Sequence, residues 1–538
     1  MESCQTKPQA FCILAAGTGS RLGHLTSFVN KALLPVDHRA VLSHIIEKVP
    51  ETCDIVVAVH FDQEKIREYC AAAHPDREIT FVEVETITGP GSGPGYSLLA
   101  CREHLQRPFY LCNVDTLVRE EYPTLEHNWL GFAVVEDNRP YATLEMEVGT
   151  SVVTRVADKK KSKSSFAYIG LMGIRDWQHF WKKLDTARSE KPEFQYIAAF
   201  QRINYPTPVY GYGFVWLDTG SEAGYKEACK HLKSDQILGM EKTIDEITYK
   251  VGSRLIKLCV DSEKNRKRIQ RGELFESVPT MVYQGRYLVA WEWIKGKTLY
   301  DLRNLEDWEM FLQDCDAEFW EFRHEVPNWK EICYKFYHDK TVERLERYRQ
   351  QQHMDAPYLF VNGFKCGNAE KYLKCIDWDW VCQGYAVSFH GDLQFDNVIY
   401  EQGGHYKFID WRECFGESEL YGDIYYDLAK LYSGIDLPYD QLKRLNFELK
   451  TEKGINGWGF AEYNVEINSY LTSFKMIYEA WLVREGFDVD RVRLLSALIH
   501  LNMSPLHPAP VGDLLFYHAN LRLAILYDAG SKGFVKVG

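Results

Sequence analysis

A glycine-rich turn directly follows the first apolar run of the chain. The run FCILAA leads into Gly17-Thr18-Gly19-Ser20-Arg21, and Lys31 lies ten residues after Arg21. A glycine turn at the end of a strand exposes backbone N–H groups to phosphate oxygens, and two cations add the positive charge that a triphosphate needs. This pattern predicts a nucleotide site. Its expected backbone contacts are Ala15, Ala16, Gly17, Gly19 and Ser20, and its expected catalytic side chains are Arg21 and Lys31.

Two aspartates stand at the ends of later apolar runs. PFYLCNVDTLV carries Asp115, and GYGFVWLDTGS carries Asp218. Carboxylates together with substrate phosphates are the usual ligands of Mg²⁺, and the ion neutralises charge that develops on phosphorus as pyrophosphate departs. We therefore expect Asp115 and Asp218 to hold Mg²⁺ beside the glycine turn. Taken alone, an aspartate at a strand end is more often a turn or cap residue.

The turn and the lysine belong to one longer pattern, LAAGTGSRLG followed by NKALLPV. This pattern resembles the opening signature of the nucleotidyltransferase family that makes NDP-sugars and CDP-alcohols, and the resemblance extends to about residue 235. It implies an α/β nucleotidyltransferase fold with a Rossmann-like mixed sheet, in which Asp115 and Asp218 match the metal positions. A dinucleotide site would instead require G-x-G-x-x-G, and Arg21 occupies the place of its third glycine.

The resemblance implies two further contacts. The loop TGPGSGPGYSLL matches one that contacts the nucleotide in the family, so Gly93 is expected to bind nucleotide, although the sugar-type version usually reads closer to GTAGAL. The lysine run 159–161 falls where sugar nucleotidyltransferases often place a lysine on the acceptor phosphate. A solvated loop is an equally good interpretation of that run.

A second group of polar residues lies in VSFHGDLQFDNVIY and YKFIDW. Phosphoryl transfer from ATP needs a carboxylate that accepts the proton of the attacking hydroxyl, and oxygen ligands that hold Mg²⁺ against the phosphates. Asp392 suits the first role, and Asn397 and Asp410 suit the second. His390 is interpreted as a residue that shapes the loop.

HGDLQFDN with IDW resembles the aminoglycoside phosphotransferase and choline kinase family over about residues 240–538, and it implies an α+β kinase-like domain. In that comparison Lys257 is the lysine that contacts the ATP phosphates, with Lys250 as a competing candidate and Glu273 as the partner carboxylate. The segment 292–294 resembles the hinge that presents backbone groups to adenine. The glycine-rich phosphate loop of protein kinases is absent.

The order of apolar runs predicts how these residues are positioned. Up to about residue 235, short apolar runs alternate with helix-like stretches, which is βαβ order and favours a mostly parallel sheet. From about residue 240, antiparallel strands surround a helix, NRKRIQRGELFE, and a long helical region follows. We therefore expect two domains, a nucleotidyltransferase domain at 1–238 and a kinase-like phosphotransferase domain at 239–538.

Composition excludes several classes of protein. The 538 residues exceed what one core usually organises, and 46% hydrophobic content favours a packed globular chain. A formal net charge of −13 argues against nucleic acid as a partner, and the apolar run near the N-terminus is too short for a signal peptide or a membrane span. Fourteen scattered cysteines indicate a reducing compartment, so we expect a cytoplasmic location and no membrane partner. Homo-oligomer formation stays open.

A kinase makes a phosphomonoester and a nucleotidyltransferase consumes one, so the fusion suggests consecutive steps. We expect ATP to phosphorylate a small alcohol, amino-alcohol or sugar, and CTP then to give a nucleotide-activated precursor for surface glycans, with Mg²⁺ at both sites. The choice of CTP rests on analogy with choline-kinase-like enzymes. Three alternatives stay open: a sugar acceptor that gives an NDP-sugar, one active domain beside a regulatory nucleotide sensor, and a noncatalytic scaffold.

Overall fold

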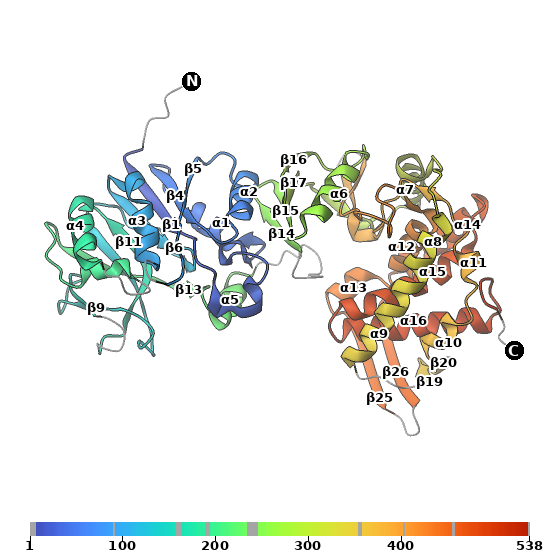
Figure 1. Ribbon diagram of the computed structural model, residues 1–538. Coiled ribbons are helices and arrows are strands. Elements are labelled where there is room, and N and C mark those ends of the chain that lie inside the picture. The colour runs from blue at the N-terminus through green and yellow to red at the C-terminus, as the bar shows by residue number, and fades with distance from the viewer. Residues whose placement is uncertain are drawn as a thin grey trace. The chain divides into compact units, whose positions relative to one another are not determined.

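The structure is a computed structural model that describes residues 7–89, 92–157, 163–188, 194–233, 246–352, 358–401, 404–453 and 458–535 (Figure 1). Packing divides the described residues into two compact units. The first contains the residues up to 233 together with 246–260 and 281–291, and the second contains 261–280 and 292–535. No helix in the described ranges combines the length and the apolar character that crossing a bilayer demands.

The first unit is built on a nine-stranded mixed sheet. Its main path runs β10-β9-β11-β6-β1-β4-β5, with β8 paired to β11 and β12 paired to β8. The strands are β1 Gln9–Leu14, β4 Cys53–Val59, β5 Ile79–Glu83, β6 Phe109–Asn113, β8 Asn128–Val134, β9 Thr143–Met146, β10 Val153–Ala157, β11 Phe166–Ile174 and β12 Val209–Gly213. β1 is parallel to β4 and β6, whereas β11 is antiparallel to β6, which confirms the expected α/β fold with a mixed sheet.

Shorter elements surround this sheet. The helices are α1 Val41–Ile46, α2 Gln63–Ala73, α3 Pro94–Ala100, α4 Trp177–Ala187 and α5 Glu222–His231, and 3-10 helices span Ser20–Thr26, Lys31–Leu33, Arg102–Leu105 and Tyr196–Phe200. The short strands β2 Pro35–Val36 and β3 Arg39–Ala40 pair with each other, as do β7 Thr116–Val118 and β13 Trp216–Asp218.

Alternate residues of β1 face two separate apolar cores. Phe11 and Ile13 pack into a core with residues of α1 and α2, and Cys12 and Leu14 pack into another with residues of α3 and α4. Side chains on a strand point alternately to opposite faces, so helices cover both faces of the sheet. A strand buried on both faces reads as a continuous apolar run, which is why FCIL carries no polar residue.

Four strands that the sequence assigned to the second domain pack with the first unit. They are β14 Glu246–Val251, β15 Arg254–Cys259, β16 Met281–Gln284 and β17 Leu288–Glu292, and they form a sheet in the order β14-β15-β17-β16. Tyr249 and Ile256 share a core with Phe11, and the Tyr249 hydroxyl donates to the Leu33 carbonyl at 2.6 Å. The packing therefore differs from a single boundary at 238/239, which itself lies outside the described residues.

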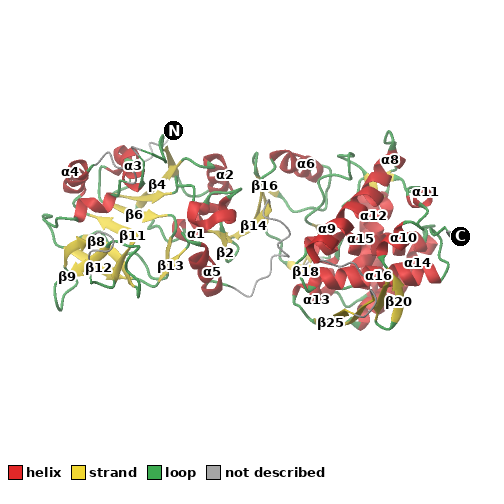
Figure 2. Cartoon of the chain, turned by 60° about the horizontal axis from the view of Figure 1, so that its bottom comes forward, coloured by secondary structure: helices red, strands yellow, loops and turns green. Residues whose placement is uncertain are grey.

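The second unit is mostly helical (Figure 2). Its helices are α6 Ser262–Gly272, α7 Leu305–Cys315, α8 Trp329–Tyr334, α9 Lys340–Gln352, α10 Ala369–Leu373, α11 Trp378–Val381, α12 Ile424–Asp436, α13 Tyr439–Lys443, α14 Ser469–Arg484, α15 Val489–Met503 and α16 Val511–Asp528. Short helical turns span Leu299–Asp301, Asp316–Trp320, Lys335–Asp339, Phe395–Asn397 and Ser504–Leu506. Its strands are β18 Gly296–Thr298, β19 Tyr358–Val361, β20 Phe364–Gly367, β21 Ala386–Val387, β22 Val398–Glu401, β23 Tyr406–Phe408, β24 Gly422–Asp423, β25 Phe447–Lys453 and β26 Trp458–Val465.

Helix α12 lies in the centre of this unit. Every residue from Ile424 to Asp436 is buried, and the helix packs along α15, which in turn packs along α16. A helix buried on all sides cannot leave charged side chains in water, so its aspartates and its lysine must find partners inside the protein. Asp427 and Lys430 find theirs in the second candidate site, whereas Asp436 pairs with Lys475 on α14 and with His518 and Arg522 on α16.

Candidate active sites

The predicted glycine turn lies at the carboxyl end of β1. Ala15 and Ala16 are buried and Gly17 and Ser20 are exposed, so the turn rises from the core to the surface over a few residues. Gly19 has a φ of 72°, a backbone conformation that favours glycine. Gly17 differs, because a Cβ on it would meet no atom of the described structure within 4 Å. The fold itself therefore does not require a glycine at 17.

Asn30 holds this turn in place, although sequence reasoning did not single it out. Its fully buried amide nitrogen donates to the carbonyls of Ala15 at 3.1 Å, Gly17 at 3.3 Å and Phe61 at 2.9 Å. Its amide oxygen accepts from the N–H of Ala32 at 2.9 Å and so begins the short helix that carries Lys31. One side chain thus fixes both the turn and the predicted lysine. An asparagine directly before that lysine was the available signal.

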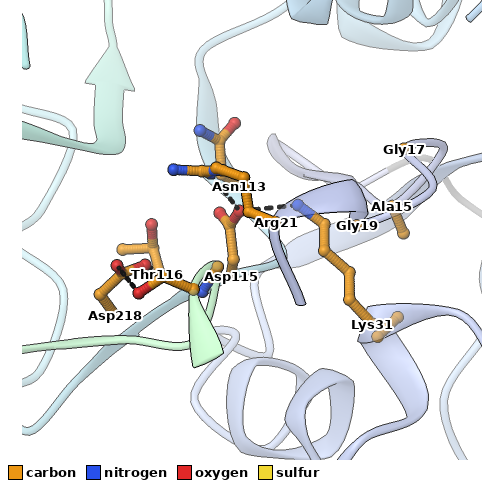
Figure 3. A network of polar contacts seen from close by, with 12 residues as sticks. Ala15, Gly17, Gly19, Arg21, Lys31, Asn113, Asp115, Thr116 and Asp218 are labelled. Carbon is orange, nitrogen blue, oxygen red and sulfur yellow. Dashed lines mark hydrogen bonds and ion pairs between the residues drawn. The ribbon is translucent and has the colours of Figure 1, made fainter. Parts of the chain in front are cut away.

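Lys31 and Arg21 both lie beside Asp115 (Figure 3). The Lys31 Nζ is 2.6 Å from Asp115 Oδ2, and the Arg21 guanidinium is 3.9 Å from the same oxygen. Burial acts to raise the pKa of Asp115, but Lys31 and then Arg21 outweigh it and hold that pKa below its ordinary value. Asp115 is therefore ionised at neutral pH.

Asp218 ends β13, whose pairing with β7 places it opposite Thr116. A backbone hydrogen bond from Thr219 to the Asp115 carbonyl, 3.0 Å long, ties the two segments together. Asp218 accepts from the N–H of Gly220 at 2.9 Å and from the Ser221 hydroxyl at 3.2 Å. Burial raises the pKa of Asp218, and the charge of Asp115 adds to the rise.

Gly220 marks the space between the two carboxylates. A Cβ on this glycine would stand 2.8 Å from Asp115 Oδ2, 3.1 Å from Asp218 Oδ1 and 3.1 Å from Arg21 Nη2. Because one point lies so near both oxygens, they are less than 6 Å apart. Carboxylate oxygens together with phosphate oxygens and waters are the usual ligands of Mg²⁺, so Asp115 and Asp218 are the residues that would hold the ion. Among the described residues no cluster of three or more His, Cys, Asp or Glu forms a metal site from protein alone.

The remaining predicted contacts of this site are less informative. Gly93 precedes α3 with a φ of 108°, and residues 90–91 of its loop lie outside the described chain. The lysine run 159–161 also falls outside the described residues. Gly93 as a nucleotide contact and the run as an acceptor contact stay predictions.

The second unit brings Asp392, Asn397 and Asp410 together. The Asn397 amide donates to Asp392 Oδ2 at 3.2 Å and to the Asp392 carbonyl at 2.8 Å. The N–H of Ile409, the residue before Asp410, donates to the Asn397 carbonyl at 2.9 Å. Asp410 itself has a φ of 58°, a conformation that non-glycine residues adopt rarely and often at functional sites.

His390 supports this arrangement from inside the core. Its Nε2 is 3.0 Å from the Ile409 carbonyl and its Nδ1 is 3.2 Å from the N–H of Asp392, so one ring joins the two segments. The side chain is fully buried, and burial lowers the pKa of His390 to about 4. A neutral imidazole that makes two structural hydrogen bonds fits the expected role in shaping the loop.

Two residues of α12 anchor the same loop. Lys430 donates to Asp392 Oδ1 at 2.7 Å, and burial of the ammonium is outweighed by Asp392, which raises the pKa of Lys430. Asp427 accepts from the N–H groups of His390 at 2.7 Å and Gly391 at 2.6 Å. Burial raises the pKa of Asp427 to about 6. The sequence showed the four-residue spacing of Asp423 and Asp427 but gave neither a role.

The predicted ATP contacts lie in both units. Lys257 on β15 belongs to the first unit and stands 3.5 Å from Glu246 on β14, whereas Glu273 belongs to the second unit. The hinge-like segment Glu292–Ile294 lines an open cavity of about 460 Å³ with Pro279, Thr280, Lys295, Glu401 and Lys407. The N–H of Glu292 donates to the Thr280 carbonyl at 2.9 Å. Lys257 and the hinge stay predictions.

Known proteins resemble the first part of the chain. The family model described as the MobA-like NTP transferase domain matches residues 11–125. The chain is 26% identical over 220 residues to "Bifunctional protein GlmU" of Methanococcus vannielii, with 39% of this chain and 51% of that protein covered. It is 27% identical over 225 residues to the protein of the same name in Methanocaldococcus jannaschii, with 41% and 53% covered. The chain thus spans about half the length of these curated relatives.

Solved structures also align with part of the chain. A CTP:phosphocholine cytidylyltransferase from Streptococcus pneumoniae covers 42% of this chain and all of that chain, at 20% identity and a TM-score of 0.37. An inositol-1-phosphate CTP transferase from T. maritima covers 43% of this chain and 98% of that chain, at 15% identity and a TM-score of 0.36.

Proposed function

We propose, from the premise that the N-terminal part of this chain is a MobA-like NTP transferase domain, that the protein is a bifunctional enzyme. The second site would phosphorylate a hydroxyl of a small molecule with ATP, and the first would join that phosphate to a nucleotidyl group from CTP. The observation that carries the proposal is the pair Asp115 and Asp218 on either side of Gly220, with Lys31 and Arg21 beside it.

In the first step, the acceptor hydroxyl attacks the γ-phosphorus of ATP. The O–H bond and the bond to the β-phosphate oxygen break, an oxygen–phosphorus bond forms, and ADP leaves. Asp392 accepts the proton, and Lys430 and Asn397 hold its carboxylate in a fixed position. Asn397 and Asp410 are the residues that would hold Mg²⁺. The kinase assignment rests on these contacts and on the likeness of residues 390–411 to small-molecule kinases.

In the second step, an oxygen of the phosphomonoester attacks the α-phosphorus of CTP. The bond between the α-phosphorus and the bridging oxygen breaks, and pyrophosphate leaves. Lys31 and Arg21 lie where they can neutralise phosphate charge, and the turn at Gly17 exposes backbone N–H groups to it. Mg²⁺ held by Asp115 and Asp218 would neutralise charge on the α-phosphate.

A second candidate keeps both reactions and changes the acceptor. The segments LLPV and WLDTG are typical of sugar nucleotidyltransferases, so a sugar phosphate and another NTP could replace the CTP route. The two candidates share the catalytic residues and differ only in acceptor and base.

The test is a direct assay of both products. Purified protein receives ATP, CTP and Mg²⁺ with a panel of alcohols, amino-alcohols and sugars, and ADP and pyrophosphate are measured separately. The proposal expects ADP release with a particular acceptor, and pyrophosphate release only when CTP and that acceptor are both present. Pyrophosphate release with UTP or another NTP in place of CTP supports the sugar candidate. Neither product with any acceptor contradicts both.

A further inference from the structure

Four cationic side chains gather beside Asp392 in the second unit. Lys340 begins α9, Arg344 lies one turn later, Arg412 follows Trp411, and Lys430 lies on α12. The Lys340 ammonium is 3.9 Å from the centre of the Phe336 ring, and the Arg412 guanidinium is 5.2 Å from the same centre. Two positive charges therefore lie close to one aromatic ring.

Within the described chain, three members of this cluster lack a carboxylate at ion-pair distance, although burial of Arg412 is outweighed by Tyr426, Glu413, Cys414 and Asp392, which together raise the pKa of Arg412. Of the four cations, Lys430 pairs with Asp392, while Lys340, Arg344 and Arg412 have no carboxylate within 4.0 Å among the residues that the structure describes. Arg344 donates to the Asn502 carbonyl at 3.0 Å and Arg412 to the Cys414 carbonyl at 2.9 Å, and because both acceptors are neutral these bonds do not cancel the positive charges. Burial lowers the pKa of Lys340 well below its ordinary value, and the charges of Arg412, Arg344 and Lys430 add to that effect. Half-buried cations that repel one another are costly, so an arrangement of this kind needs an anion to complete it.

The cluster also lies next to the catalytic loop. The N–H of Arg412 donates to the His390 carbonyl at 2.9 Å, two residues before Asp392. A Cβ on Gly391, which has a φ of 84°, would stand 2.5 Å from the Arg412 Cβ. Lys430, a neighbour of Lys340, is itself the partner of Asp392. An anion held by these cations would therefore sit close to the carboxylate that accepts the proton.

We propose that Lys340, Arg344 and Arg412 bind an anionic group of the acceptor, so that the molecule phosphorylated is an alcohol carrying a carboxylate or a phosphate. This inference rests on the proposed function and narrows its substrate class. It disfavours choline and other cationic alcohols, because three cations without a carboxylate partner among the described residues would repel a quaternary ammonium. Arginine and lysine side chains are the usual donors to carboxylate and phosphate.

The test compares acceptors that share a skeleton and differ in charge. ADP release is measured with gluconate against glucitol, glucose 6-phosphate against glucose, and choline against glycerol. We expect release with an anionic member and none with its neutral partner, and the carboxylate and phosphate arms identify which anion is accepted. Release with choline or a neutral alcohol, and not with the anionic members, overturns the inference and leaves the kinase proposal intact.

Variants separate a binding role from a structural one. Lys340→Met and Arg344→Gln should each lower kcat/KM for the anionic acceptor by about 10- to 100-fold, with the KM for ATP within twofold. The melting temperature of Lys340→Met should stay unchanged or rise, because the substitution removes a charge that has no carboxylate partner in the described chain. Arg344→Gln also loses the hydrogen bond to the Asn502 carbonyl, so its melting temperature should fall slightly. Lys335→Met is the matched control, since its exposed ammonium pairs with Glu331 and Glu417. Equal kcat/KM in Lys340→Met and wild type contradicts the inference.

A binding measurement covers the case in which the kinase proposal fails. Calorimetric titration of the full chain with inorganic phosphate and with gluconate needs no turnover. Suppose that no ADP is released with any acceptor, that wild type and Lys335→Met bind an anion, and that Lys340→Met does not. That result supports the anion site and contradicts the kinase proposal. If wild type binds neither anion and releases no ADP, both proposals fall.

Discussion

The two candidate sites use the same ion pair in opposite charge environments. In the first, Lys31 contacts Asp115 at 2.6 Å, and in the second, Lys430 contacts Asp392 at 2.7 Å. Around Asp115, two cations face two carboxylates in near balance. Around Asp392, three further cations stand without a carboxylate partner among the described residues.

This difference in charge balance indicates what kind of ligand each site favours. A balanced site binds a triphosphate with an added Mg²⁺, because its own cations are already partly neutralised. An unbalanced site binds an anion directly, because the ligand supplies the missing charge. The acceptor, and not only the nucleotide, then contributes negative charge at the second site.

The largest expected effect separates the sites completely. Asp115→Asn should lower the rate of pyrophosphate release by a factor of about 10³ and leave the rate of ADP release within twofold of wild type. Asp392→Asn should do the reverse. Rates are measured with the acceptor for ADP and with a supplied phospho-acceptor for pyrophosphate. Loss of both activities from either single change would show that the sites are not independent.

The two lysines should differ in what their removal costs. Lys430→Met removes the cation that contacts Asp392, in a pair whose side chains are only 8% and 16% exposed, so we expect the second unit to lose about 3 kcal/mol of stability. The Lys31–Asp115 pair is similarly buried, but Lys31→Met leaves the Arg21 guanidinium 3.9 Å from Asp115, so the stability loss should be smaller, about 1 to 2 kcal/mol, while pyrophosphate release falls about 100-fold. Urea unfolding and both product assays measure these changes. Equal losses of stability in the two variants would contradict the claim that Arg21 still supports Asp115 once Lys31 is removed.

Alanine substitutions in the glycine turn should have smaller effects, which separate nucleotide binding from stability. Because a Cβ on Gly17 meets nothing within 4 Å, Gly17→Ala should unfold like wild type yet raise the KM for the nucleotide about tenfold by crowding the phosphates. Gly19→Ala is the comparison, since its φ of 72° and a Cβ 3.0 Å from Thr26 Cγ2 predict lost stability as well. An unchanged KM in Gly17→Ala would mean that no phosphate approaches this turn.

Two buried titratable groups, one in each unit, should make opposite contributions to the pH dependence of stability. Burial lowers the pKa of His74 in the first unit to about 4, so its contribution is fully present above about pH 6.5 and is lost as pH falls toward 4. Burial raises the pKa of Asp423 in the second unit to about 7, so its contribution is present at acid pH and is lost as pH rises toward 7. At about 1.36 kcal/mol per pKa unit, the effect reaches about 3 kcal/mol for His74 and about 4 kcal/mol for Asp423.

Matched variants test these signs. The stability advantage of wild type over His74→Gln should shrink from pH 7 to pH 4.5, and the advantage over Asp423→Asn should grow over the same change. Urea unfolding at the two pH values measures both. Two advantages that move in the same direction would contradict the opposite burial effects.

The main residues of each site could be predicted from the sequence, because most of them end or follow an apolar run that forms a strand. Lys31 and Asp115 follow parallel neighbouring strands, whose carboxyl ends meet at one edge of a sheet. Asn30 and Gly220 were missed, because their roles depend on carbonyls and carboxylates that only the folded chain places near them.

The second unit was less predictable for the same reason. Lys430 lies 38 residues after Asp392, and only the burial of α12 brings the pair together. The strands β14 to β17 pack with the first unit because Tyr249 and Leu258 join its apolar core. The sequence showed their alternation but carried no local signal for the core that they join.

Complementation between two inactive variants tests the central claim most directly. Asp115→Asn and Asp392→Asn proteins are incubated alone and mixed, with ATP, CTP, Mg²⁺ and an anionic acceptor, and mass spectrometry detects the nucleotidyl product. The account predicts product from the mixture and from wild type, and none from either variant alone. A mixture that yields no product while wild type does, or wild type that yields none, would contradict two separate sites acting in sequence.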